Sequence, residues 1–160
     1  MPALADYPGR VPGEGPDADV AAHYGDPLRE QRQMARAVAV IDRSDRGLVV
    51  VRGADRLSWL HSLTTQHLEQ MPESTSIEGL ILSPHGHVEQ DLWFTSTGEE
   101  VWIDCEPGKA AELAEYLERM RFMLRVEVED ASDSFAMATV VGPKAREVVE
   151  AVLDGSAPDA

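Results

Sequence analysis

Residues 74–106, STSIEGLILSPHGHVEQDLWFTSTGEEVWIDCE, predict three consecutive β-strands joined by two tight turns. The first strand is an apolar run that stops at Ser83-Pro84-His85-Gly86, where proline cannot continue a ladder and glycine adopts the angles of a tight turn. A second turn lies at residues 96–99. The predicted strands are Ile77–Leu82, His87–Thr95 and Val101–Cys105. This meander also holds the densest set of reactive side chains, so the rest of the chain is interpreted as its support.

The side chains of the middle strand alternate between two faces. We expect the first face to belong to the core; it carries Val88, Leu92 and Phe94, with Gln90 as its one polar residue. The opposite face carries His87, Glu89, Asp91 and Trp93. These side chains are too polar and too large for a second packed core. They are predicted to line a cleft.

The composition excludes several classes of protein. The chain has 160 residues and a net charge of −15, so a nucleic-acid partner held through its phosphates is not expected. It has neither a signal-peptide pattern nor an apolar run of about 18 to 20 residues, which predicts a cytoplasmic protein without a membrane partner. The single cysteine, Cys105, permits no internal disulfide and is interpreted as a buried strand thiol rather than a nucleophile.

The remaining elements flank the meander on both sides. Residues 1–27 are rich in proline and glycine and predict an extended or partly disordered arm. The other predicted elements are a helix at Leu28–Val40, a polar connector at Ile41–Gly47, a strand at Leu48–Val51, a helix at Ala54–Thr65, a helix from Pro107 to Arg121, a strand at Arg125–Glu129, a strand at Phe135–Val141 and a helix at Lys144–Leu153.

This order predicts an α+β fold. From Leu48 to Glu129 the elements run strand, helix, three strands, helix, strand, which is typical of an antiparallel sheet with helices on one face. The free face is then expected to carry the polar side chains of the middle strand. The last strand and helix have few partners in this sequence, so they are interpreted as fragments of a second α+β domain that is truncated here.

Three other candidate sites each have a simpler interpretation. His85 and His87, followed by Glu89 and Asp91, could suggest a metal site, but the spacing is common and solvated turn histidines are favoured, so no metal is predicted. Ser83 lacks the Gly-x-Ser-x-Gly context of a nucleophile and is interpreted as a turn residue. No glycine-rich phosphate loop is present in the sequence.

Two side chains on the polar face have stronger functional interpretations. Trp93 could stack on a flat heterocycle, although tryptophans in strands more often belong to a core or an edge. Asp91 lies mid-strand and is expected to be partly desolvated, which would make it a better proton acceptor or donor near neutral pH. The alternative for Asp91 is a carboxylate at the rim of the sheet.

Three segments, in this order and spacing, resemble the glycine-cleavage T-protein (aminomethyltransferase, GcvT) superfamily of folate-binding proteins. The segments are Arg52-Gly53-Ala54-Asp55 leading to Leu63-Thr64-Thr65-Gln66, then Leu82-Ser83-Pro84-His85-Gly86-His87 leading to Asp91-Leu92, then Val141-Gly142-Pro143-Lys144-Ala145. The resemblance runs from about Tyr24 to Val152 and corresponds to about half of a family member.

The resemblance implies three domains around a central hole that holds tetrahydrofolate. Residues 48–130 would be a complete α+β domain of the folate-binding type, whereas residues 28–47 and 131–160 would be parts of a discontinuous neighbour. Asp91 matches the acid that assists methylene transfer in the aminomethyltransferases, so it is the expected catalytic residue. The expected folate-binding residues are Asp91, His87, Glu89, Trp93 and Arg46.

The chain also departs from the transferase pattern. Gln90-Asp91 replaces an acid pair, Ser44-Asp45-Arg46-Gly47 replaces the connector SHMG, and Glu78 stands near the position of a tyrosine. These departures favour the YgfZ-type branch, whose members bind tetrahydrofolate and are linked to iron–sulfur cluster assembly or repair and to tRNA modification. Iron–sulfur proteins would then be partners. The alternatives are an aminomethyltransferase and, from another class, a non-catalytic acidic α+β interaction module.

Overall fold

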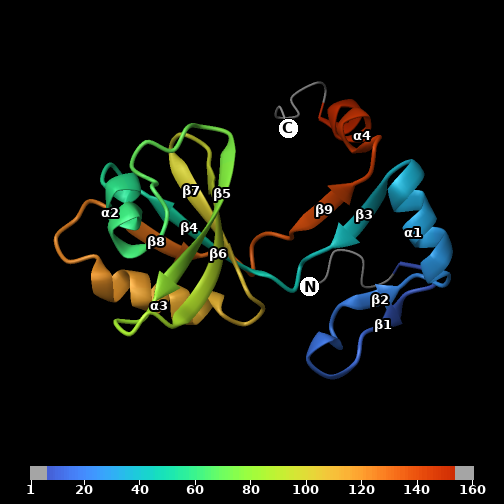
Figure 1. Cartoon of the computed structure of the whole chain (residues 1–160), viewed down its shortest axis with the longest axis horizontal. Coiled ribbons are helices and arrows are strands. Elements are labelled where there is room, and N and C mark those ends of the chain that lie inside the picture. Colours follow the sequence, from blue (N-terminus) through green and yellow to red (C-terminus); the bar gives the residue numbers. More distant parts are fainter. Residues whose placement is uncertain (1–6, 154–160) are drawn as a thin grey trace. The chain divides into compact units, whose positions relative to one another are not determined.

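The predicted meander forms three adjacent strands of a five-stranded antiparallel sheet in the computed structural model, which describes residues 7–153 (Figure 1). The order of the strands across the sheet is β5-β6-β7-β4-β8. The strands are β4 (Gly47–Arg52), β5 (Thr75–Leu82), β6 (Val88–Ser96), β7 (Glu100–Cys105) and β8 (Glu127–Asp130). With two helices, α2 (Arg56–Leu63) and α3 (Ala110–Met120), they confirm the predicted α+β fold.

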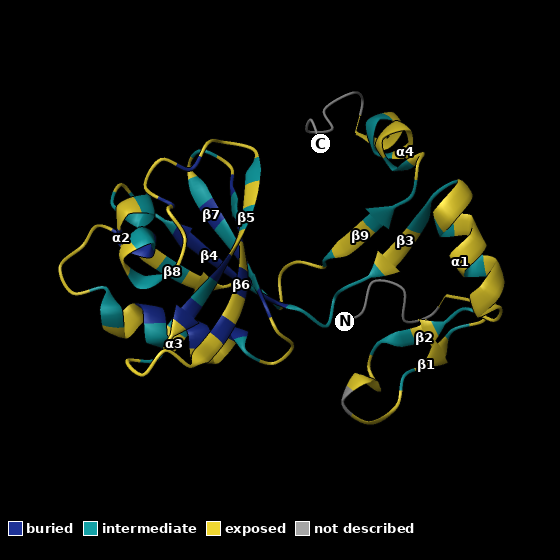
Figure 2. Cartoon of the chain, viewed as in Figure 1, coloured by how far each residue is buried: buried dark blue, intermediate teal, exposed yellow. Residues whose placement is uncertain are grey.

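One face of this sheet is covered by the two helices. Trp59 and Leu60 of α2 and Leu113 and Leu117 of α3 are buried in one cluster with alternate residues of the strands. The buried strand residues in this cluster are Val49, Val51, Ile81, Leu92, Phe94, Val101, Ile103 and Cys105. Figure 2 shows this core as the dark segments of the sheet and of α3. The alternation of apolar and polar residues in the sequence therefore predicts the buried face correctly for most of the meander.

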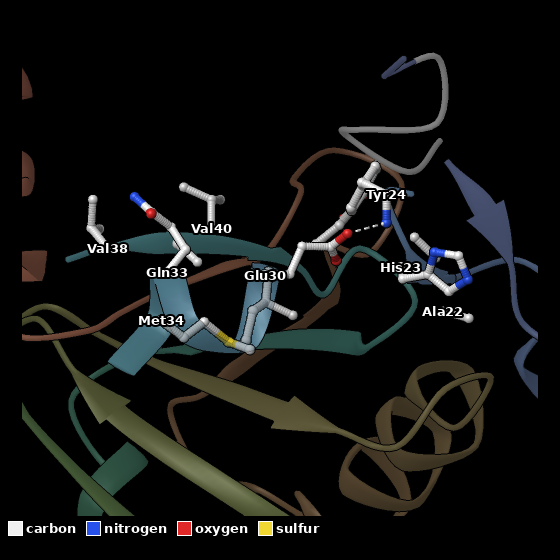
Figure 3. Close-up of a pocket in the computed structure, with 12 residues that line it drawn as sticks. Ala22, His23, Tyr24, Glu30, Gln33, Met34, Val38 and Val40 are labelled. Carbon is white, nitrogen blue, oxygen red and sulfur yellow. Dashed lines mark hydrogen bonds between the residues drawn. The ribbon is translucent and has the colours of Figure 1, made fainter. Parts of the chain in front are cut away.

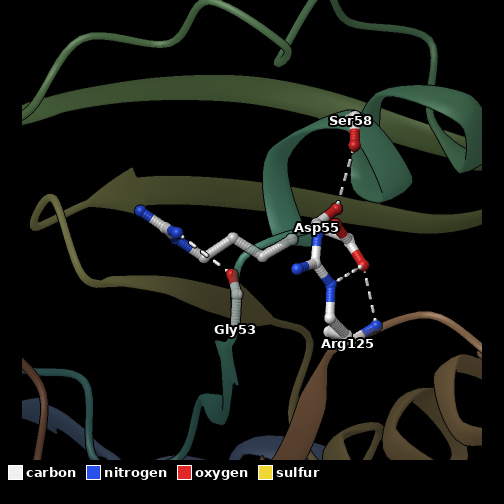
Figure 4. A network of polar contacts seen from close by, with 5 residues as sticks. Gly53, Asp55, Ser58 and Arg125 are labelled. Atoms are coloured by element: carbon white, nitrogen blue, oxygen red, sulfur yellow. Dashed lines mark hydrogen bonds and ion pairs between the residues drawn. The ribbon is translucent and has the colours of Figure 1, made fainter.

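A network of polar contacts holds the start of α2 against the chain before β8 (Figure 4). Asp55 Oδ2 accepts hydrogen bonds from the backbone nitrogen of Arg125 at 2.9 Å and from its Nε at 3.0 Å, and Oδ1 accepts one from Nη2 at 2.7 Å. These bonds lower the pKa of Asp55 below its ordinary value. Asp55 precedes the helix as its N-cap residue, but its side chain makes no cap hydrogen bond, so its main structural partner is Arg125 rather than the helix.

The chain divides into two compact units. Unit 2 spans Arg46–Phe135 and contains the five-stranded sheet. Unit 1 contains the described residues before Arg46 and after Phe135. Its elements are β1 (Val11–Pro12), η1 (Gly15–Asp17), β2 (Ala21–His23), α1 (Pro27–Arg36), β3 (Ala39–Asp42), β9 (Ala138–Val141) and α4 (Ala145–Val152). None of the described residues of unit 1 is fully buried.

Unit 1 corrects three predictions. The supposed extended arm contains the β1–β2 hairpin, closed by a hydrogen bond from the Gly13 nitrogen to the Val20 oxygen at 2.8 Å; residues 1–6 lie outside the described chain. The first helix ends at Arg36 rather than Val40. The polar connector is shorter than predicted, because residues 39–42 form β3, which pairs antiparallel with β9.

Other boundaries shift by a few residues. Pro107 does not open α3, since the helix begins at Ala110, and the last strand begins at Ala138 rather than Phe135. Gly142 fixes the junction after β9: its φ is 121°, and a side chain there would approach the Ala37 oxygen to 2.5 Å. The Ala37 oxygen instead accepts a hydrogen bond from the Lys144 nitrogen at 2.9 Å. Contacts between segments that are distant in the sequence therefore set where α1 ends and where α4 begins.

Candidate functional site

The face of the sheet opposite α2 and α3 is the candidate site, and we call it the open face. Strand pairing assigns to it Ser76, Glu78 and Leu80 of β5, Asp91, Trp93 and Thr95 of β6, Glu100, Trp102 and Asp104 of β7, Leu48, Val50 and Arg52 of β4, and Glu127 and Glu129 of β8. This face is strongly acidic.

The β4 side of the open face is occupied by ion pairs and stacked rings. Arg52 donates to Glu100 and Glu129, both at 2.5 Å. The rings of Trp102 and Phe135 meet edge to face with centroids 4.9 Å apart. Val50, which lies opposite Trp102 in the register, is completely buried although it lies outside the main core cluster. The side chains of this half of the face therefore contact one another.

The β5–β6 side is accessible. Trp93 is 45% exposed, and the Asp91 carboxylate two residues earlier is exposed and makes no hydrogen bond or ion pair with any described residue. In the register Asp91 lies opposite Leu80, and Trp93 lies between Glu78 of β5 and Asp104 of β7. The expected partial desolvation of Asp91 is wrong for this chain, because no described residue covers it.

Arg46 reaches the same face through an ion pair. Its Nε lies 2.6 Å from Asp104 Oδ1, and both side chains are largely buried. Because Asp104 is the register partner of Trp93, this pair connects the start of β4 to the accessible half of the open face. Asp104 was not among the predicted site residues, although the alternation of Val101, Ile103 and Cys105 with Trp102 and Asp104 was a signal that could have found it.

In the turn before β6 and at the start of that strand, the side chains do not alternate strictly between the two faces of the sheet. His87 is exposed in the turn, where its backbone nitrogen donates to Ser83 Oγ at 3.1 Å. Ile81 pairs with Gln90 but Leu82 pairs with Val88, so Glu89 is the extra residue of a β-bulge. Val88 is 58% exposed rather than in the core. Glu89 lines a cavity beside α3, so the bulge separates it from Asp91.

The remaining candidate, Cys105, is consistent with a structural role. Cys105 is fully buried, as predicted, and burial followed by the nearby Asp104 raises its pKa to about 11. Within residues 7–153, no group of three or more His, Cys, Asp or Glu side chains is arranged to hold a metal ion. No helix in that part of the chain is both long and apolar enough to cross a membrane.

Unit 1 has a cavity of its own, with a volume of about 390 Å³, between β2, α1 and β3 (Figure 3). The Tyr24 backbone nitrogen donates to Glu30 Oε1 at 2.9 Å at one end of it, and Met34 and Val40 contribute apolar wall. The Tyr24 hydroxyl is buried without a hydrogen-bond partner in the described chain, and burial raises its pKa. None of the predicted site residues lies in this cavity.

Comparison with known proteins defines the class to which this fold belongs. Residues 19–159 match the GCVT N-terminal domain, so the chain belongs to that family. It is 28% identical over 134 residues to an aminomethyltransferase of Thermus thermophilus, a match that covers 82% of this chain and 38% of the relative. It is 29% identical to a probable aminomethyltransferase of Pyrococcus horikoshii, with 79% and 34% covered.

A solved structure agrees with the fold. The glycine cleavage system aminomethyltransferase T from Bartonella henselae superposes with a TM-score of 0.76 at 19% identity, over 98% of this chain and 42% of that one. The chain therefore spans about two fifths or less of the length of the relatives that it matches.

Proposed function

We propose that the open face of unit 2 binds tetrahydrofolate. The observation that carries this proposal is the pairing of a half-exposed indole, Trp93, with a free carboxylate, Asp91, on one accessible face. The pterin ring of tetrahydrofolate is a flat heterocycle with several N–H donors. An indole provides a surface on which such a ring stacks, and a carboxylate accepts charge-assisted hydrogen bonds from its nitrogens.

Asp91 would act on the ring electrostatically. Its carboxylate has no partner in the described chain, so it is available to accept a hydrogen bond from a ring nitrogen or to hold a proton for it. A ligand that covers the face would also remove water from Asp91 and strengthen that hydrogen bond. In this proposal Trp93 stacks on the ring, Arg46 orients the edge of the site through Asp104, and His87 lies at its rim.

We place the chain in the YgfZ-type branch, with a role in iron–sulfur cluster assembly or repair and in tRNA modification. The supporting feature is Glu78, which lies opposite Trp93 on the open face, near the position at which the transferase pattern has a tyrosine. The substitution at Gln90 supports this choice less strongly, because Gln90 is buried on the other face of the sheet. The second candidate is an aminomethyltransferase, which is favoured by the names of the matched relatives.

Titration of the 15N-labelled chain with tetrahydrofolate tests the binding proposal. We expect weak, saturable shifts of the amides of β5 and β6 around Asp91 and Trp93 and of the Trp93 indole N–H. Shifts confined to unit 1 or to the α3 side of the sheet, or no shifts up to the solubility of the ligand, would refute the site. Loss of iron–sulfur enzyme activity and of tRNA modification in a gene deletion, with glycine cleavage intact, would support the YgfZ branch; the reverse pattern would support the transferase.

A further inference from the structure

A second cavity lies on the opposite face of the sheet, where the bulge of β6 meets α3. Its volume is about 290 Å³, and its lining residues are Ile81, Glu89, Gln90, Glu112, Tyr116 and Arg119. All of them belong to unit 2. The three α3 residues are spaced i, i+4 and i+7 and form one stripe along the helix, beside the buried stripe of Leu113 and Leu117.

Gln90 is the unusual residue of this cavity. It is only 9% exposed on the core face of β6, yet its carboxamide makes no hydrogen bond with any described residue. Its amide oxygen and nitrogen are not among the fully buried side-chain atoms that lack a partner, so they remain accessible although the residue as a whole is buried. The amide therefore lies in the wall of the cavity, where a ligand can hydrogen-bond to it.

Glu89 adds an unpaired charge beside that amide. The bulge brings both Glu89 and Gln90 to the cavity, and the Glu89 carboxylate has no ion-pair partner in the described chain. The other charges are already engaged: Glu112 accepts from Lys109 Nζ at 2.8 Å, and Arg119 donates to Glu115 at 3.5 Å. The free groups of the cavity are therefore mainly acceptors, with a net negative charge.

We propose that this cavity binds the ammonium group of a small aliphatic amine. An ammonium group has three N–H donors, and three of the residues that line the cavity carry acceptor groups for them: Glu89 a carboxylate, Gln90 a carbonyl and Tyr116 a hydroxyl. Ile81 and the ring of Tyr116 provide apolar surface for the methylene groups of the ligand. This site is separate from the proposed folate face, which lies on the other side of the sheet.

Calorimetric and NMR titrations of the whole chain with putrescine and with n-butylammonium test the proposal. We expect saturable binding with shifts of the Gln90 side-chain NH2 signals, and no binding of n-butanol. Glu89→Gln and Gln90→Leu should each weaken binding by about tenfold or more. Gln90→Leu should leave the melting temperature nearly unchanged, because the substitution removes no hydrogen bond within the described chain.

Glu99→Gln is the matched control, since it removes the same charge from an exposed turn of the same meander and should leave binding unchanged. Equal weakening by Glu99→Gln and Glu89→Gln would mean that the amines act only as counterions of an acidic protein. That result, the absence of saturable binding, or unchanged affinity in Gln90→Leu would overturn the proposal.

Discussion

Arg46 Nε donates a hydrogen bond to Asp104 Oδ1 at 2.6 Å, which ties the first residue of unit 2 to the third strand of the meander. The two residues are 58 positions apart in the sequence. The Arg46 side chain is 16% exposed and the Asp104 side chain 22%. At this degree of burial, loss of one partner leaves the other charge poorly solvated, so the pair matters more than a surface ion pair.

The first prediction concerns this pair. Asp104→Asn and Arg46→Gln should each lower the free energy of unfolding by about 1 to 2 kcal/mol, and the double variant should lose less than the sum of both. Urea unfolding of the four proteins measures the coupling. Arg119→Gln, which removes an exposed pair with Glu115, is the control and should change stability little. If the losses in free energy of unfolding from the two substitutions are strictly additive, the ion pair contributes nothing to stability.

The second prediction concerns the close packing of β4, β7 and α3. A Cβ atom on Gly47 would lie 2.6 Å from Cys105 Sγ and 2.9 Å from the Cβ of Ala110. Gly47→Ala should therefore destabilise the protein by about 1 to 3 kcal/mol through overpacking. Cys105→Ala in the same chain should recover part of this loss, because it removes the nearer atom. Additive losses in a double-mutant cycle by denaturant unfolding would contradict this packing.

The third prediction follows from the raised pKa of Cys105, about 11 against an ordinary value of 9.0. Between these values the unfolded thiol loses its proton while the folded thiol keeps it, so the folded state binds more protons and stability falls as the pH rises. Thermal melts from pH 8 to pH 11 should show a decline that is smaller in Cys105→Ala. The native thiol should also react slowly with an alkylating reagent at pH 8. Rapid reaction without unfolding would contradict its burial.

The fourth prediction compares the two units. Unit 2 has a continuous buried core. In unit 1 no described residue is fully buried, and this holds for all of α4. Amide hydrogen exchange should therefore be faster in β9 and α4 than in β4, β6 and β7. Gly142→Ala should accelerate exchange in unit 1 alone, because a side chain at φ 121° is strained and meets the Ala37 oxygen. Equal protection of both units in a monomer would contradict this prediction.

The meander was predictable because its information is local. Alternation from Gln90 to Ser96 and the turn residues at both ends determine which side chains are buried, and the structure follows that pattern. The bulge at Glu89 was not predictable, since one extra residue in a strand leaves no mark in its composition. The pairing of Ala39 with Val141 was also hidden, because a contact between distant segments decides where α1 ends.

The candidate site shows the same division. Alternation placed Asp91 and Trp93 on one face, and the structure agrees with that placement. It could not reveal that Arg46 reaches this face through Asp104, because the ion pair depends on the register between strands. Nor could it place the second cavity, which arises where the bulge meets a helix.

Comparison of tetrahydrofolate binding by the wild-type chain and by Asp91→Asn tests the central claim most directly. Asparagine keeps the shape of the side chain and removes its charge, while Asp133→Asn removes an exposed charge elsewhere in unit 2. If Asp91 contacts the pterin ring, NMR titration should show affinity lower by about 1 to 3 kcal/mol, roughly 5- to 150-fold, in Asp91→Asn alone, with the melting temperature nearly unchanged. Unaltered affinity in folded Asp91→Asn would remove Asp91 from the site and contradict the assignment of the open face to folate.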